Sequence, residues 1–127
     1  MDVAETNRSN PYATQFKIIE VEGIEIETDQ EGYIQDLDAW SEAFAIASAR
    51  QENIELTQEH WDVIYYIRNY HDEHSIQATV RDMLIHFKKA WGKERGNNRH
   101  LHDIFPNGGP QKQGNRFAGV RRTKGEH

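Results

Sequence analysis

Apolar side chains recur three or four positions apart in three successive segments between residues 40 and 91. Residues at this spacing share one face of an α-helix, so each segment predicts a helix with a single buried stripe. We expect these helices at about 36–50, 57–70 and 77–91, the first capped by Asp36 or Asp38. In the first helix the expected buried stripe is Trp40, Ala43, Phe44 and Ala47.

Two short runs rich in β-branched residues precede these helices, at 16–21 and 24–28. Glu22 and Gly23 lie between them, and glycine readily supplies the positive φ of a tight turn, so the pattern predicts a β-hairpin. Tyr33 and Ile34 could pair briefly as a third strand. Because an isolated hairpin is marginally stable in water, it must pack on the helices.

Beyond residue 91 the pattern is shorter and more often interrupted by glycine and proline. We expect Gly92 to end the third helix, and two further short helices to lie at 99–105 and 111–118. The predicted fold class is therefore α+β, mainly α: a bundle of about five helices with an N-terminal β-hairpin and a flexible C-terminal arm. The 127 residues, 36% of them hydrophobic, suffice for one core and one domain. We expect residues 1–14 to form a flexible arm and residues 119–127 a mobile tail.

The net charge of −6 conceals an uneven distribution. Residues 1–87 hold 5 Lys or Arg and 18 Asp or Glu, whereas residues 88–127 hold 10 Lys or Arg and 3 Asp or Glu. A basic C-terminal third on an acidic body favours an anionic partner: nucleic acid, an acidic protein surface or a phosphate. The alternative is that the two parts attract each other within the fold.

The sequence contains no cysteine, which excludes disulfides, thiol nucleophiles, persulfide carriers and thiolate metal sites among these residues. The first ten residues, MDVAETNRSN, form a mainly polar stretch that lacks the apolar core of a secretory signal, and no apolar run is long enough for a membrane span. We therefore expect a cytoplasmic protein without membrane contact. Seven histidines include the pairs His71/His74 and His100/His102, but no third ligand has an identifiable spacing. We therefore expect no metal and no cofactor, and no catalytic site emerges from the serines or paired carboxylates.

The helices expected at 57–70 and 77–91 can be interpreted as a helix-turn-helix, the second one facing a DNA groove. The possible DNA contacts are Gln77, Arg81, Lys88, Lys89, Lys93, Arg95 and Arg99. Against this interpretation, Asp72, Glu73 and Asp82 lie close by in the sequence and would repel phosphates.

Several stretches resemble the DsrC/TusE family of sulfur-trafficking proteins. The similar stretches are IEIETDQEGYIQDLDAW at 24–40, IELTQEHWDVIYYIRNY at 54–70, FPNGGPQKQ at 105–113, and Ala118-Gly119. The resemblance covers most of the chain from residue 16 onward. It implies that family's fold, a helical bundle with an N-terminal β-hairpin and a flexible C-terminal arm.

In that family the chemistry is carried by the arm, where a penultimate cysteine holds a persulfide or joins a trisulfide. The DsrC branch has a second, earlier arm cysteine that closes a disulfide. The corresponding positions here are Glu126 and Asn115, neither of which can form a persulfide.

The resemblance therefore implies a member without transfer chemistry, not an enzyme, that acts by docking or regulation near sulfur-relay or sulfite-reductase proteins. The expected partner contacts are Arg116, Arg121, Arg122 and Lys124. The alternative function is a DNA-binding transcriptional regulator that uses the helix pair.

Overall fold

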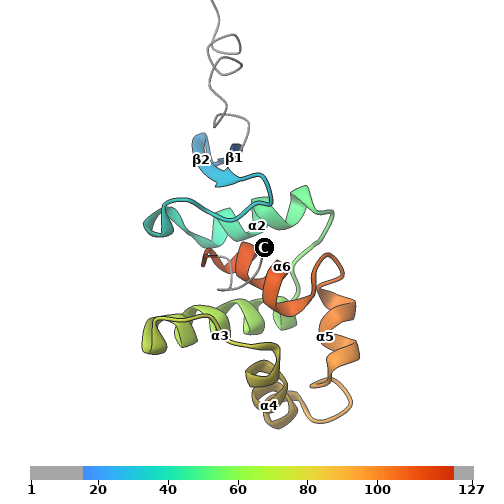
Figure 1. Ribbon diagram of the computed structural model, residues 1–127. Helices are drawn as coiled ribbons and strands as arrows, with labels where there is room; N and C mark the ends of the chain where they lie inside the picture. Colours follow the sequence, from blue (N-terminus) through green and yellow to red (C-terminus); the bar gives the residue numbers. More distant parts are fainter. Residues whose placement is uncertain (1–15, 122–127) are drawn as a thin grey trace, which may run out of the picture.

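The described chain begins with a β-hairpin. The computed structural model describes residues 16–121, and within them β1 (Phe16–Val21) pairs antiparallel with β2 (Ile24–Asp29), with Ile19 opposite Ile26 (Figure 1). Both turn residues have positive φ, 52° at Glu22 and 82° at Gly23, as a two-residue turn requires. Ile19 and Val21 face the helices and are buried. The predicted hairpin is confirmed.

The turn after β2 folds the chain back under the hairpin. Asp29 Oδ1 accepts hydrogen bonds from the backbone N–H of Glu31 (2.9 Å) and Tyr33 (3.0 Å). Ile34 then forms a single bridge with Thr28, so the third strand suggested by the sequence is reduced to one residue pair. Tyr33 and Ile34 are both 2% exposed, and this return therefore anchors the hairpin to the body.

The first predicted helix is divided in two. A short 3-10 turn, η2 (Leu37–Ala39), is capped by Asp36, and α2 (Glu42–Gln51) begins only after Ser41. Trp40 between them is extended, with ψ 144°. The Ser41 hydroxyl accepts from the Phe44 N–H at 3.1 Å and so starts a new helix. The buried face is accordingly shifted from the expected stripe, to Phe44, Ala45, Ser48 and Ala49.

The next two helices have different boundaries from those predicted. Thr57 caps α3 (Gln58–His74), which runs four residues beyond the expected end because the left-handed residue is Ser75 (φ 60°). Helix α4 (Val80–Trp91) starts three residues later than expected. Its cap is Thr79, whose hydroxyl accepts from the Asp82 N–H at 3.1 Å. Gly92 ends α4 as predicted.

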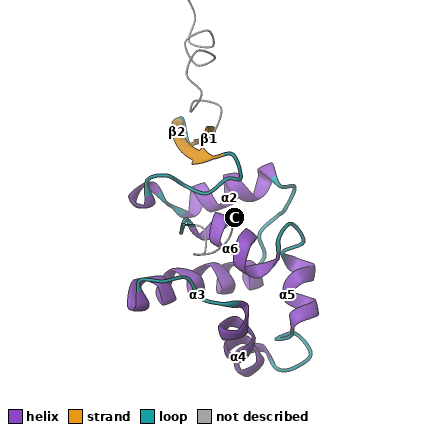
Figure 2. Cartoon of the chain, viewed as in Figure 1, coloured by secondary structure: helices purple, strands orange, loops and turns teal. Residues whose placement is uncertain are grey.

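The last two helices close the core. Asn97 caps α5 (Asn98–Ile104), and α6 (Gly109–Ala118) lies between α2 and α3, also contacting α5 (Figures 1 and 2). Eight of the ten residues of α6 are buried. A Cβ at Gly114 would lie 2.7 Å from Cδ1 of Ile67, so this glycine allows α6 to approach α3 closely.

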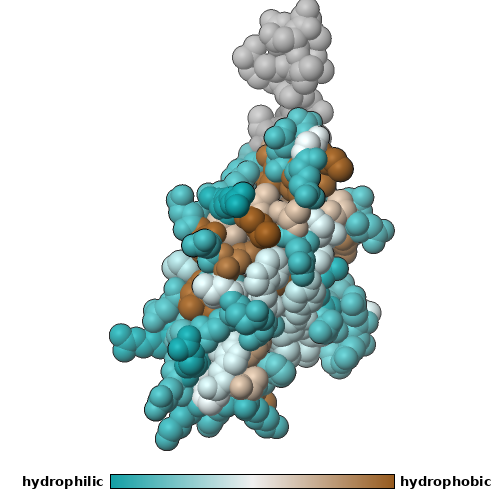
Figure 3. Space-filling view, turned by 180° about the vertical axis from the view of Figure 1, so that it is seen from behind, coloured by the Kyte–Doolittle hydropathy of each residue, from teal (hydrophilic) through white to brown (hydrophobic). Residues whose placement is uncertain are grey.

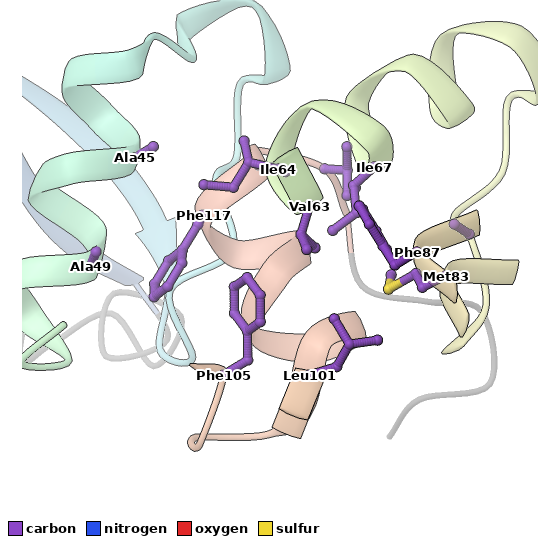
Figure 4. Close-up of a cluster of buried hydrophobic side chains, with 13 residues drawn as sticks. Ala45, Ala49, Val63, Ile64, Ile67, Met83, Phe87, Leu101, Phe105 and Phe117 are labelled. Carbon is purple, nitrogen blue, oxygen red and sulfur yellow. The ribbon is translucent and has the colours of Figure 1, made fainter. Parts of the chain in front are cut away.

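The main hydrophobic core is built around α3 and α6 (Figure 4). Its largest fully buried side chains include Ile64, Ile67, Phe87, Phe105 and Phe117. A second, smaller cluster joins the hairpin to α2 through Ile19, Val21, Ile34 and Phe44. None of the helices within residues 16–121 has the length and apolar character needed to span a membrane. On the face in Figure 3, hydrophobic residues gather toward the hairpin end.

An ion-pair cluster joins the start of α3 to α5 and to the loop that precedes α5. The Glu59 carboxylate accepts from Arg95 Nε at 2.6 Å and lies 2.8 Å from His100 Nε2. The hydrogen bond from Arg95, with a smaller one from His100, outweighs the effect of burial and lowers the pKa of Glu59 from 4.5 to about 2.

Acid should therefore weaken the fold through Glu59. A carboxyl whose folded pKa is depressed stabilises the fold above its unfolded pKa and ceases to do so as pH falls toward its folded pKa. Between pH 4.5 and about 2, we expect the free energy of unfolding to fall less in the Glu59→Gln variant than in the unaltered protein. Urea unfolding at successive pH values measures this. Glu55→Gln, at an exposed position, is the control. If the unaltered protein and both variants lose the same free energy of unfolding in acid, Glu59 does not contribute to the acid sensitivity of the fold.

Candidate functional site at the end of the last helix

The backbone carbonyls at the end of α6 are bound by side chains from two distant elements. Trp40 Nε1 donates to the Phe117 carbonyl at 2.8 Å, and Arg68 Nη1 donates to the Ala118 carbonyl at 2.7 Å. The last carbonyls of a helix lack partners within the helix, so these bonds satisfy groups that would otherwise need water. They also hold the end of α6 in one place relative to α3 and Trp40.

Arg68 and Trp40 are positioned by one another. The guanidinium carbon of Arg68 lies 3.7 Å from the centroid of the Trp40 ring, and the Tyr65 ring stands nearly perpendicular to the same ring, with the two centroids 6.1 Å apart. Burial lowers the pKa of Arg68, although a guanidinium remains protonated in proteins. Its positive charge therefore lies at the carbonyl end of α6, where the helix dipole favours a cation.

The chain then leaves the body along a defined path. Gly119 caps α6 with φ 71°, the Val120 N–H donates to the Asn115 carbonyl at 3.2 Å, and Val120 is 3% exposed within the main core. Gln77 Nε2 donates to the Arg121 carbonyl at 3.1 Å. The exit thus lies beside the connection between α3 and α4. The predicted mobile tail cannot begin at Gly119, because Val120 belongs to the core.

Arg121 lies at this exit. It borders a hollow of about 290 Å³ with Asp29, Tyr33, Ile34 and Gln35, the segment that returns from the hairpin. Arg121 is itself exposed. Of the expected partner contacts, Arg121 is therefore accessible, while Arg122 and Lys124 lie outside the described residues, as does Glu126.

Arg116 is not accessible, and its expected role as a partner contact is wrong. Its side chain is 8% exposed, and Nε and Nη2 donate to the Glu52 carboxylate at 3.0 and 2.9 Å. The Asn107 side chain (2.7 Å) and the Gln113 side chain (2.8 Å) donate to the same carboxylate. This Glu52 network joins the end of α2 to α6. Asn115, which the resemblance aligned with the family's second arm cysteine, is fully buried in α6.

The residues considered for DNA binding do not all lie on one exposed recognition helix. Gln77 precedes α4 and is bonded to the Arg121 carbonyl, and Arg95 is paired with Glu59. The remaining candidates are exposed: Arg81, Lys88, Lys89, Lys93 and Arg99. The helix that was to enter the groove therefore begins after its expected first residue, Gln77, and Arg95, which lies beyond the end of α4, is paired within the protein.

The two histidine pairs weighed as metal ligands lie in two separate helices. His71 and His74 lie in the last turn of α3, and His100 and His102 lie in α5. Within residues 16–121, no group of three or more His, Asp or Glu side chains could hold a metal ion. His60, which the sequence analysis did not single out, accepts from the Thr57 N–H at 2.9 Å and contacts the Ile104 carbonyl at 2.7 Å. Burial lowers the pKa of His60, so its neutral form is favoured.

Comparisons with known proteins agree on one family. The model of a family described as DsrC like protein matches residues 20–125. The chain is 42% identical over 99 residues to Sulfurtransferase TusE of Salmonella choleraesuis, covering 78% of this chain and 90% of that one. It is 41% identical over 103 residues to Sulfurtransferase TusE of Pectobacterium atrosepticum, covering 81% and 94%.

Two solved structures share the fold. The NMR structure of Allochromatium vinosum DsrC matches with a TM-score of 0.77 and 42% identity over 87% of this chain and 97% of that one. The oxidized γ-subunit of the dissimilatory sulfite reductase (DsrC) from Archaeoglobus fulgidus matches with a TM-score of 0.77 and 33% identity over 86% and 98%.

These comparisons correct one expectation and leave another without support. The relatives are named sulfurtransferases, which contradicts the expectation that the chain is not an enzyme. The names of the matched proteins concern sulfur transfer and sulfite reduction, so they do not support the DNA-binding alternative or a helix-turn-helix assignment.

Proposed function

Since the chain belongs to the DsrC family of sulfur-relay proteins, we propose that it works by docking onto a sulfur-relay or sulfite-reductase protein. The observation that carries this proposal is the anchored exit of the chain after α6. Side chains of Trp40, Arg68 and Gln77 bind three carbonyls between Phe117 and Arg121. Whatever follows Arg121 therefore starts from a fixed point on the surface, as a docking segment requires.

The relatives support a partner of this kind. One matched structure is named as a subunit of dissimilatory sulfite reductase, and the curated relatives are named as sulfurtransferases. A persulfide forms on a thiolate, and none of the 127 residues is cysteine. The proposal therefore assigns the sulfur-bearing thiol to the partner. By docking, this chain occupies the partner's contact surface, which gives the interaction a regulatory effect.

Charge reversal at the exit tests the proposal. We expect Arg121→Glu with Arg122→Glu to slow association with purified sulfite reductase or relay sulfurtransferase by about tenfold at low salt, because exposed charges mainly steer encounter. The difference should shrink as salt is raised. Biolayer interferometry with the full chain measures both rates.

A matched pair of substitutions provides the control. Lys89→Glu with Arg99→Glu changes the net charge equally at exposed positions, in the last turn of α4 and in α5. These changes should leave the association rate within about twofold, since they lie away from the exit. Equal slowing by both pairs would show that net charge alone matters, and no slowing by the Arg121 pair would refute docking through this segment.

A further inference from the structure

A groove between α3 and α4 remains unused by the docking proposal. Its volume is about 720 Å³, and Glu42 of α2 lies at its border. Six of its thirteen lining residues are aromatic side chains of the two helices: Trp61, Tyr65, Tyr66, Tyr70, Phe87 and Trp91. Grooves with aromatic walls and a few polar groups are the usual form of a binding site.

The aromatic wall is held together by ring contacts. The Tyr66 ring lies 5.5 Å from Phe87 across the two helices and 5.9 Å from Tyr70 along α3. The ring centroids of Phe87 and Trp91, both on α4, lie 4.3 Å apart. Such contacts fix ring positions on both sides of the groove, so the ring faces are arranged before any ligand arrives.

The charged groups that line the groove are acidic. Glu42, Asp62 and Glu73 border it, and no Lys or Arg is among the lining residues. Asp62 is held in place because Trp91 Nε1 donates to it at 3.1 Å and Gln58 Nε2 at 2.9 Å. The guanidinium of Arg68, the one arginine of α3, lies over Trp40 instead. The groove is therefore a negatively charged surface with aromatic walls.

Carboxylates beside aromatic faces favour one class of ligand. Lys and Arg side chains bind over aromatic rings and pair with carboxylates, and the two effects add where both groups line one groove. Phosphates of nucleic acid or lipid would be repelled by the three carboxylates. We propose that this groove binds a basic, Arg- or Lys-bearing segment of a partner protein. This second surface does not depend on docking through Arg121.

An arginine–glycine repeat peptide labelled with fluorescein is the probe. Bound to the full chain, it should raise fluorescence anisotropy at low salt, while the same peptide with glutamate for arginine should not. Glu42→Lys with Glu73→Lys should weaken binding by about tenfold or more, because it reverses two of the three groove charges. Both positions are exposed, so the fold should persist, and thermal unfolding checks this.

The matched control lies on the hairpin. Glu25→Lys with Glu27→Lys makes the same change in net charge on exposed strand positions and should change affinity less than about twofold. Equal loss in both pairs, or no loss in the groove pair, overturns the proposal. Sedimentation tests one further alternative. If the chain forms a dimer, and the groove pair of substitutions dissociates it, the groove binds a second copy of the chain and the proposal is wrong. The two proposals can fail separately. If the groove pair loses peptide binding while the Arg121 and Arg122 substitutions leave the association rate with the sulfur-relay protein unchanged, the groove proposal stands and the docking proposal fails.

Discussion

Replacing Glu52 with alanine is expected to lower the free energy of unfolding by about 3–5 kcal/mol, because it leaves a buried charge unpaired. The uncompensated charge is that of Arg116, whose side chain is 8% exposed. Asn107 and Gln113 also lose the acceptor that both now share. Urea unfolding followed by circular dichroism measures the change, with the m-value as a check that the transition stays two-state.

Two further variants identify the cause. Glu55→Ala removes a nearby carboxyl from an exposed position and should change stability by less than about 0.5 kcal/mol. Glu52→Leu with Arg116→Met removes both charges and should restore part of the loss, since a buried pair can be replaced by apolar side chains at little cost. If Glu52→Ala costs no more than Glu55→Ala, the network does not stabilise the junction of α2 with α6.

Gly119→Ala is expected to destabilise the protein by about 2–4 kcal/mol, the sum of left-handed strain and a steric collision. Gly119 has φ 71°, and a Cβ there would lie 2.7 Å from Cγ of Trp40, with Cδ1 closer still. The collision pushes the indole away and breaks its hydrogen bond to Phe117. Unfolding in urea gives the energy, and tryptophan emission reports the altered surroundings of the ring.

The hairpin supplies the control for this substitution. Gly23 also has positive φ, 82°, but no heavy atom lies within 4 Å of a Cβ built there. Gly23→Ala therefore isolates the backbone strain, for which we expect about 1–2 kcal/mol. An equal cost at the two glycines would mean that Trp40 yields easily and does not fix the exit of the chain.

The elements that the sequence predicted well carry their signals locally. Glu22 and Gly23 mark the hairpin turn, Thr57 marks the start of α3, and Gly92 marks the end of α4. Each signal acts within a few residues of itself, so it can be recognised without the tertiary structure. One error arose where two caps competed: Asp36 and Ser41 are equally good caps, and only the extended Trp40 between them separates η2 from α2.

The site was harder to predict because its contacts are distant in the sequence. Arg116 is 64 residues from Glu52, and Trp40 is 77 residues from the carbonyl it binds. As a sequence position, Arg116 is one more cation in a basic segment, and burial alone reveals its different role. The family resemblance, by contrast, placed the fold correctly, because its similar stretches include the residues at the hairpin, α3 and α6.

The central position of α6 also determines when the protein can fold during its synthesis. A ribosome makes the hairpin first and reaches α6 only after the three helices that pack on it, α2, α3 and α5. A nascent chain that has completed α5 therefore exposes three apolar helix faces with nothing between them. During this interval it is a substrate for chaperones and proteases. Substitutions that weaken the packing of α6 thus lower the yield of protein in the cell, beyond their effect on the finished fold.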